Sequence, residues 1–439
     1  MKWFERLMAR HRRKRPPQEI FTPKSVVRRE MFARRNEPDL QGRPGVQDRL
    51  REALRDPGGQ VLIYGDTGVG KSSLLRYAAE DEGLATVSIE CFSQRTYEQI
   101  LQECIGRLVT FTEVSFSESY TAGSQMQLSV GAPQLMTASG STKAEFGQSR
   151  TFRAVQKEPI EVLLDAMQAT KRQLVVLDNF QNVDNDRARS LVAQTMERLS
   201  DRADETGDKK MVVIGISDDA HALLGGSGSF SRRTAEVGVP RMPDDEIRQV
   251  LVNGFHLLGL TASDPGLDRM VFLSDGFPYF AHLVGQSVAK AARRADAAHI
   301  SGEMVESALS DAAEQVEQNY STRVRSALEA GGDVQPRRRI LELLAYDESR
   351  IEWSSNDTTD LYGEKYGTRS DWSFLLSALA ALTSEKHGTI LRRSGTRGRY
   401  IYKFSDPHLR PFLRIATFPR SEATGSEGDD GSAAGASVG

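Results

Sequence analysis

Short apolar runs and amphipathic stretches alternate over most of the 439 residues of the chain. Short apolar runs that end in Gly, Ser or Asp are typical of buried strands, whereas apolar residues spaced by three or four are typical of helices. Strands that alternate with helices form a parallel sheet covered on both faces, so the pattern predicts an α/β fold. We expect the strands at 61–64, 85–91, 173–179, 210–218 and 237–240.

From Pro243 onward the pattern becomes helical, which predicts a lid-sized bundle. Beyond residue 335, two helices are followed by a β-hairpin, and this order indicates a winged helix. We expect the bundle helices from Asp244 and near 265–274, 278–295 and 301–318, and the later elements at 337–345, 373–382 and 389–404.

Changes in composition divide the chain into five parts. Within residues 112–157, the stretches 114–120 and 125–130 alternate with period two on either side of Gly123, and Gly, Ser and Thr are dense through Gly147. This indicates a β-rich, hairpin-like insertion; a plain surface loop is the alternative. The five parts are a basic N-terminal arm (1–37), an α/β core that carries the insertion (38–240), a helical lid (241–332), a winged-helix domain (333–418) and a disordered tail (419–439).

Charge is distributed unevenly, although the formal net charge is only −3. Lys and Arg dominate residues 1–35, which is typical either of a solvated arm or of an electrostatic contact with nucleic acid. A contact with a membrane surface is a weaker alternative. No apolar stretch is long enough to span a bilayer, and the two cysteines, Cys91 and Cys104, form no disulfide framework. We expect both to be reduced core residues of a cytoplasmic protein.

The stretch after the first apolar run has the spacing G-x-x-x-x-G-K-S between a strand and a helix. Glycines let the backbone curl so that its N–H groups face phosphate oxygens, and the helix N-terminus adds a positive potential. Lys71 is placed to reach the β- and γ-phosphates, and the Ser72 hydroxyl to ligate Mg²⁺. We expect ATP and Mg²⁺ as cofactors, with the nucleotide held by Gly65, Asp66, Thr67, Gly68, Val69, Gly70, Lys71, Ser72 and Ser73.

The apolar run 174–177 ends in Asp178. Such a strand delivers a carboxylate to the carboxyl edge of a parallel sheet, where ligands bind. This is the Walker B pattern, so Asp178 and Ser72 are the expected metal ligands.

With these motifs, and with Gly42-Arg43 ahead of the first strand, residues 40–418 resemble AAA+ and STAND ATPases of the origin-recognition-like group. The resemblance implies a P-loop core, a helical lid and a winged helix. It places Gly42 and Arg43 at the adenine end of the nucleotide. It also places Pro278, in Gly276-Phe277-Pro278, against the nucleotide.

Two further roles follow from the same resemblance. Ser217 or Asp218 stands at the sensor-1 position beside the γ-phosphate. Arg232 and Arg233 stand at the arginine-finger position, which reaches into a neighbouring subunit and implies an ATP-dependent homo-oligomer; a surface salt bridge is the alternative. The sensor-2 arginine that is usual in this group is absent from the corresponding helix turn.

Hydrolysis is less secure than binding, because a carboxylate must orient the attacking water. The family places Glu directly after the Walker B Asp, but this chain has Asn179, which cannot accept a proton at neutral pH. Glu90 is the expected substitute, on the argument that its strand neighbours the P-loop strand. Asp184 and Asp186 are more distant options. Weak basal ATP hydrolysis is therefore expected, with Asp178, Asn179, Glu90, Ser217, Arg232 and Arg233 as the catalytic set.

Two functions remain open. The first is a DNA-associated ATPase that acts as a nucleotide-dependent switch or helper without strong sequence specificity, supported by the basic arm and the wing arginines. The second is a STAND-like signalling or defence NTPase whose winged helix binds a partner protein. The presumptive recognition helix, 373–382, favours the second, because it has almost nothing with which to hydrogen-bond base edges.

Overall fold

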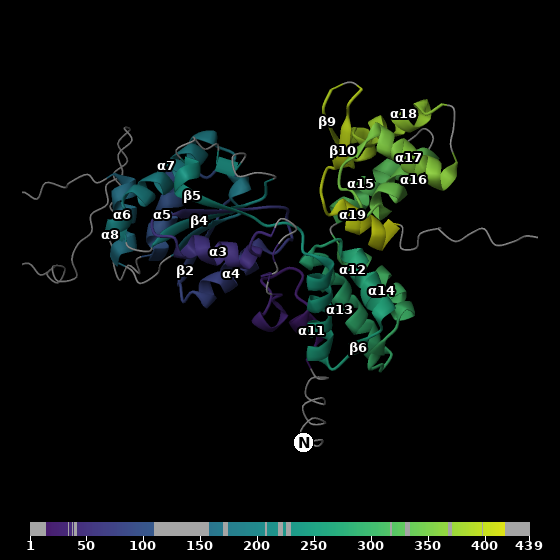
Figure 1. Cartoon of the computed structure of the whole chain (residues 1–439), viewed down its shortest axis with the longest axis horizontal. Helices are drawn as coiled ribbons and strands as arrows, with labels where there is room; N and C mark the ends of the chain where they lie inside the picture. The colour runs from purple at the N-terminus through teal and green to yellow at the C-terminus, as the bar shows by residue number, and fades with distance from the viewer. Residues whose placement is uncertain are drawn as a thin grey trace, which may run out of the picture. The chain divides into compact units, whose positions relative to one another are not determined.

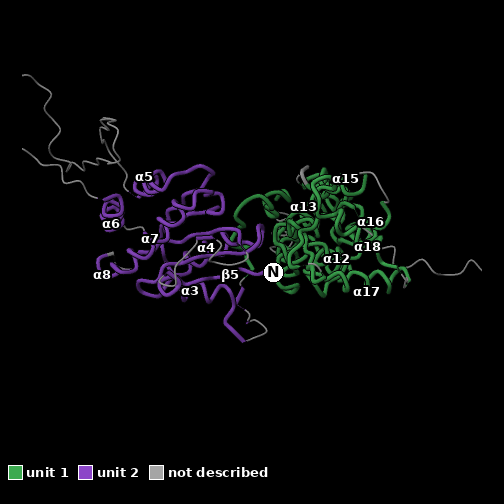
Figure 2. Tube along the Cα trace, turned by 90° about the horizontal axis from the view of Figure 1, so that it is seen from above, with its two compact units in different colours: residues 1–33, 241–439 green, residues 34–240 purple. Residues whose placement is uncertain are grey.

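A computed structural model of the chain divides into two compact units (Figure 2). Unit 2 is Arg34–Pro240, and unit 1 joins Met1–Ala33 to Arg241–Gly439. The chain thus starts in unit 1, passes through unit 2 and returns. The structure describes residues 15–33, 35–36, 38, 42–108, 158–169, 174–206, 209–217, 223–224, 230–316, 318–329, 334–367, 371–396 and 398–417. The predicted insertion near 112–157 and the tail 419–439 lie outside these ranges.

Unit 2 is built on a five-stranded sheet in the order β2-β3-β4-β1-β5, and every neighbouring pair is parallel. This confirms the predicted α/β fold, and four of the five strands lie where the sequence placed them. The fifth, β5, begins three residues earlier than expected. The strands are β1 (Gln60–Tyr64), β2 (Thr86–Glu90), β3 (Leu174–Asp178), β4 (Lys210–Gly215) and β5 (Thr234–Gly238).

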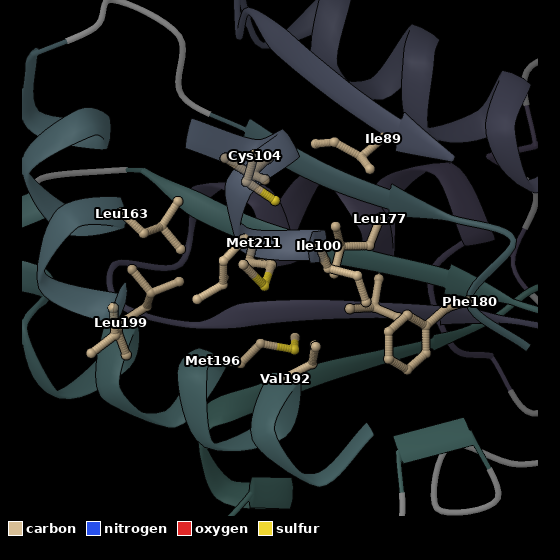
Figure 3. Close-up of a cluster of buried hydrophobic side chains, with 14 of the residues drawn as sticks. Ile89, Ile100, Cys104, Leu163, Leu177, Phe180, Val192, Met196, Leu199 and Met211 are labelled. Carbon is tan, nitrogen blue, oxygen red and sulfur yellow. The ribbon is translucent and has the colours of Figure 1, made fainter. Parts of the chain in front are cut away.

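Helices cover both faces of this sheet (Figure 1). On one face α3 contacts α4, β1 and β5. On the other, α5, α6 and α7 bury an apolar cluster that includes Ile100, Leu163, Met196 and the strand residue Leu177 (Figure 3). The helices of unit 2 are α3 (Val46–Arg55), α4 (Lys71–Asp81), α5 (Tyr97–Leu108), α6 (Pro159–Ala169), η2 (Phe180–Asn182), α7 (Asp186–Asp201), α8 (Ala203–Thr206) and α10 (Phe230–Arg233).

Cys91 and Cys104 belong to the same apolar cluster and are free thiols, as predicted. Burial raises the pKa of each thiol to about 12, so both stay protonated at neutral pH.

Unit 1 begins with a helical bundle in which α13 packs against α11, α12 and α14. None of the helices in the described ranges is long and apolar enough to cross a membrane. The elements of the bundle are α2 (Pro17–Ile20), η1 (Arg29–Met31), α11 (Asp244–Leu258), β6 (Thr261–Ala262), α12 (Asp264–Ser274), α13 (Pro278–Arg294), β7 (His299–Ile300), α14 (Gly302–Gln315) and α15 (Gln318–Glu329).

The rest of unit 1 has the order helix, short strand, two helices, hairpin, and its three strands pair antiparallel as β8-β10-β9. This order is compatible with the predicted winged helix. The elements are α16 (Val334–Tyr346), β8 (Trp353–Ser354), α17 (Ser355–Tyr366), α18 (Ser373–Leu382), η3 (Glu385–His387), β9 (Leu391–Ser394), β10 (Ile401–Phe404), α19 (Leu409–Phe412) and η4 (Leu413–Thr417).

The second half of the predicted basic arm is not a free arm. Phe21 is fully buried in unit 1, with its ring 5.3 Å from that of Phe255 on α11. Two glycines make room for it, since a Cβ on Gly254 or Gly285 would lie 2.3 or 2.5 Å from the Phe21 ring. The Thr22 N–H donates to His282 Nδ1 at 3.0 Å. The excess of Lys and Arg had suggested a solvated arm here, but the burial of Phe21 shows that this segment is packed. Residues 1–14 lie outside the described ranges.

We predict that Phe21→Ala destabilises unit 1 by about 3–5 kcal/mol, because the two glycines cannot fill the space left by the ring. Urea unfolding followed by tryptophan fluorescence measures this unit alone, since all tryptophans of the sequence fall outside 34–240. Val26→Ala is the matched control in the same segment, because Val26 is 40% exposed. Equal unfolding midpoints for the two variants would contradict the docking of this segment.

Candidate nucleotide-binding site

The P-loop connects β1 to α4 at the carboxyl edge of the sheet of unit 2. Gly65, Gly68 and Gly70 have φ angles of 143°, 72° and 94°, which side chains other than glycine rarely adopt. Gly65 is also held close to the next strand, since a Cβ there would lie 2.4 Å from the Val239 carbonyl oxygen. Gly70 caps α4 in the left-handed conformation, and its carbonyl accepts the first helical bond from the Leu74 N–H at 2.9 Å. The loop therefore turns its backbone towards the helix N-terminus, as phosphate binding requires.

Lys71, the first residue of α4, folds back over this loop. Its Nζ donates to the Gly65 carbonyl at 2.9 Å and to the Asp66 carbonyl at 2.7 Å. Burial lowers the pKa of Lys71 to about 8, although Asp178 and Asp66 oppose the shift. The two loop carbonyls thus accept hydrogen bonds from the Lys71 ammonium group. Phosphate oxygens would bind this ammonium group more strongly than the carbonyls do.

Ser72 and Asp178 meet across the site, with the Ser72 Oγ donating to the Asp178 Oδ2 at 3.0 Å. Asp178 is the last residue of β3, and its Oδ1 accepts the Asn179 N–H at 2.8 Å. A carboxylate and a hydroxyl oxygen on one side of a lysine are hard ligands that fit Mg²⁺ beside phosphates. The two residues predicted to bind the metal are therefore brought together.

Glu90 also lies at this site, but not for the predicted reason. The expectation that its strand neighbours the P-loop strand is wrong, since β3 and β4 lie between β2 and β1. Instead β2 pairs with β3 in the register Glu90 to Asp178. Asn179, in the left-handed conformation with φ 57°, donates its Nδ2 to the Glu90 Oε1 at 3.3 Å. Glu90 is therefore a carboxylate that lies directly opposite the Walker B aspartate on the neighbouring strand.

Ser217 follows β4, the strand between β3 and β1, so it reaches the same edge of the sheet. Asp218 lies outside the described residues. Sequence reasoning missed Gln181, whose Oε1 accepts the Ile216 N–H at 3.0 Å and ties the segments after β3 and β4 together. No signal in the sequence distinguishes this glutamine. Of the more distant carboxylates, Asp184 accepts the Gln94 N–H at 3.2 Å and Asp186 begins α7.

Arg232 and Arg233 lie at the opposite edge of the sheet. They directly precede β5, whose Thr234 pairs with Gln60 at the amino end of β1. Arg233 forms an ion pair with Asp201 at 2.7 Å. Within one chain the structure does not bring Arg232 and Arg233 to Lys71, so the predicted arginine-finger role requires a second copy of the chain.

The remaining predicted contacts lie on separate elements. Gly42 (φ 73°) and Arg43 are exposed in unit 2 ahead of α3. Pro278 is buried in unit 1, in the first turn of α13. Their contacts with nucleotide stay predictions.

Residues 39–214 match the family model described as an AAA ATPase domain. Residues 39–214 of unit 2 are an AAA ATPase domain. This match confirms the P-loop ATPase class that the motifs predicted. It begins ahead of α3 and ends within β4, so it covers the P-loop, Glu90, Asp178 and Asn179 of the AAA ATPase domain.

Several solved structures are similar to this chain. Cdc6p from Pyrobaculum aerophilum is 16% identical over 91% of this chain and 97% of its own, with a TM-score of 0.45. The Aeropyrum pernix ORC1 protein in complex with DNA is 14% identical over 92% and 97%, with a TM-score of 0.43. A Walker-type ATPase of Pyrococcus abyssi is 19% identical over 90% and 100%, with a TM-score of 0.49. No curated protein matches the chain.

We predict that Lys71→Ala weakens ATP binding at least tenfold, about 1.4 kcal/mol, because it removes the only side-chain cation of the P-loop. A fluorescent-ATP titration measures the affinity. Lys209→Ala is the control, since Lys209 precedes β4 at the other edge of the sheet. If the ATP affinity is unchanged in Lys71→Ala as well as in the control, the assignment of this loop to ATP binding is contradicted.

Proposed function

We propose that the chain binds ATP with Mg²⁺ and acts as a nucleotide-dependent switch that hydrolyses ATP slowly. The observation that supports this best is the meeting of Lys71, Ser72 and Asp178 at one edge of the sheet, with Asn179 directly after the aspartate. Ser72 and Asp178 would hold Mg²⁺, which would neutralise charge on the β- and γ-phosphates. Lys71 would leave the loop carbonyls for the phosphates.

Glu90 is the group that we assign to orienting the attacking water. Asn179 cannot take a proton, but its amide donates to Glu90 and so holds that carboxylate beside Asp178. The hydrogen bond also restrains the orientation of this carboxylate. A base that acts from the neighbouring strand, and that is restrained in this way, is consistent with slow turnover and with a switch.

We predict that Glu90→Gln lowers the rate of ATP hydrolysis by at least about 100-fold while ATP affinity stays within about threefold, since general bases contribute factors of 10²–10⁴. Phosphate release and nucleotide binding are measured on the same preparation. Glu98→Gln, an exposed glutamate in the first turn of α5, is the control. Hydrolysis by Glu90→Gln at the wild-type rate would show that another group is the base.

Association with DNA through phosphates belongs to the same proposal. Arg392, Arg393 and Arg399 are exposed on the hairpin β9–β10, and the Arg393 guanidinium lies 4.2 Å from the centre of the Tyr400 ring. Guanidinium groups on an exposed hairpin are suited to phosphate contacts, which carry little sequence information.

The second candidate is a winged helix that binds protein, and the surface of α18 favours it. Along this helix, all of which the structure describes, no residue is charged, and Leu376 is 45% exposed. Its exposed residues are Ser373, Leu376, Ser377 and Ala380. Such a face offers apolar contact but few donors for base edges.

A salt titration separates the two candidates. If the wing contacts phosphates, replacing Arg392, Arg393 and Arg399 together by Ala should make the slope of log K against log salt less negative by about 2–3. Each phosphate contact contributes about −0.9 to this slope. The control is Arg294→Ala with Arg325→Ala, which removes exposed arginines from the helical bundle. DNA retention that is the same in all variants at low salt would favour the protein-binding candidate.

A further inference from the structure

Two peptide segments connect unit 1 to unit 2, at residues 33–34 and 240–241. Arg35 follows the first connection, and Pro240 is the last residue before the second. Both residues belong to unit 2, so their contact lies within one compact unit.

Arg35 joins the two connections. Its side chain is only 5% exposed, and its Nη2 donates to the Pro240 carbonyl at 3.0 Å. Its own carbonyl accepts the Gln47 N–H, in the first turn of α3, at 3.0 Å. Gly45, ahead of α3, packs so closely on Asn36 that a Cβ would lie 2.3 Å from its carbonyl carbon. The segment after the first connection is therefore held between α3 and the second connection.

The second connection in turn lies against the P-loop. The Val239 N–H donates to the Tyr64 carbonyl at 2.8 Å, and the Val239 carbonyl oxygen faces the α-carbon of Gly65. The Gly65 carbonyl is one of the two acceptors of Lys71 Nζ. A continuous series of contacts thus runs from Lys71 through Gly65, Val239 and Pro240 to Arg35.

On the side of unit 1, both connections enter fixed structure. The first is preceded by the buried Met31 and by Phe21 between the two glycines. After the second, the Met242 N–H donates to the Gly276 carbonyl at 2.8 Å, and Arg241 pairs with Asp275 at 2.7 Å. A displacement of either connection would therefore be passed to the helical bundle, because packed interiors move as rigid elements.

We propose that Arg35 is a positioning residue that couples the nucleotide state of the P-loop to unit 1, by holding both connections together beside Gly65. The proposal rests on the nucleotide-dependent switch proposed above. When Lys71 leaves the Gly65 carbonyl for a phosphate, Gly65 loses that hydrogen bond, and Val239, whose carbonyl oxygen packs against Gly65, shifts with it. Because Arg35 is bonded to Pro240, a shift of the second connection also displaces the first. The two points at which the chain enters unit 1 therefore respond together.

Hydrogen exchange of the full chain, with and without a non-hydrolysable ATP analogue and Mg²⁺, tests this. In the wild type we expect nucleotide to change the exchange of residues 241–294. In Arg35→Ala that change should shrink at least threefold, while affinity for the analogue stays within about threefold. Arg35→Lys should restore at least half of the response, because its ammonium also reaches a carbonyl as a donor. Arg55→Ala, an exposed arginine of α3 paired with Glu82, should behave as wild type.

The outcomes distinguish this proposal from the switch itself. A full wild-type response in Arg35→Ala overturns the coupling role and leaves the switch intact. A wild type that binds the analogue without any change in 241–294 overturns the switch. If Arg35→Ala fails to fold, hydrogen exchange of the wild-type protein still tests the coupling. Nucleotide should change exchange at the Gln47 and Val239 amides together, and a change at Val239 alone would overturn the coupling.

Discussion

All five strands of the ATPase unit run in the same direction, and the nucleotide site depends on this constraint. Parallel strands bring all of their carboxyl ends to one edge. The segments that follow β1, β2, β3, β4 and β5 therefore meet there, although they are far apart in sequence. This edge carries the P-loop, the candidate site residues Glu90, Asp178 and Ser217, and Val239. Because the central strands are buried on both faces, their positions are held by packing rather than by the loops themselves.

Unit 1 depends on a different interaction, the burial of two arginines around Asp275. Arg410 and Arg414 are 3% and 1% exposed, and their guanidinium groups lie 3.6 and 3.2 Å from the same carboxylate. Burial lowers the pKa of Arg414 to about 10, and Asp275 opposes the shift. The excess positive charge is balanced by carbonyls at helix ends, since Arg414 donates to Phe272 in α12 and to Ala345 in α16. The segment Leu409–Thr417 is thereby held against the helical bundle.

The chemistry of the site follows from one exchange of residue types. Asn179 stands after the Walker B aspartate, where a carboxylate is usual in similar ATPases, and the carboxylate that lies beside it comes from β2. Asn179 donates to both carboxylates, from its backbone N–H to Asp178 and from its side-chain amide to Glu90, and so holds the two side by side. In the proposed function, binding draws on Lys71, Ser72 and Asp178, and hydrolysis draws on Glu90.

Local pattern determined much of the protein from sequence alone. The P-loop, the strand that ends in Asp178 and the bundle helices were predicted correctly, because their signals are spacings within a few residues. The order of the strands was not available in this way. The sequence argument had assumed that β2, which carries Glu90, lies next to the P-loop strand β1. In the structure β2 lies next to β3, and this pairing brings Glu90 beside Asn179. Residues 15–33 were misjudged for the same reason, since their charges are local while the two glycines that receive Phe21 lie more than two hundred residues away. Periodicity reports which residues are buried, but which elements they are buried against is decided only when distant segments pack together.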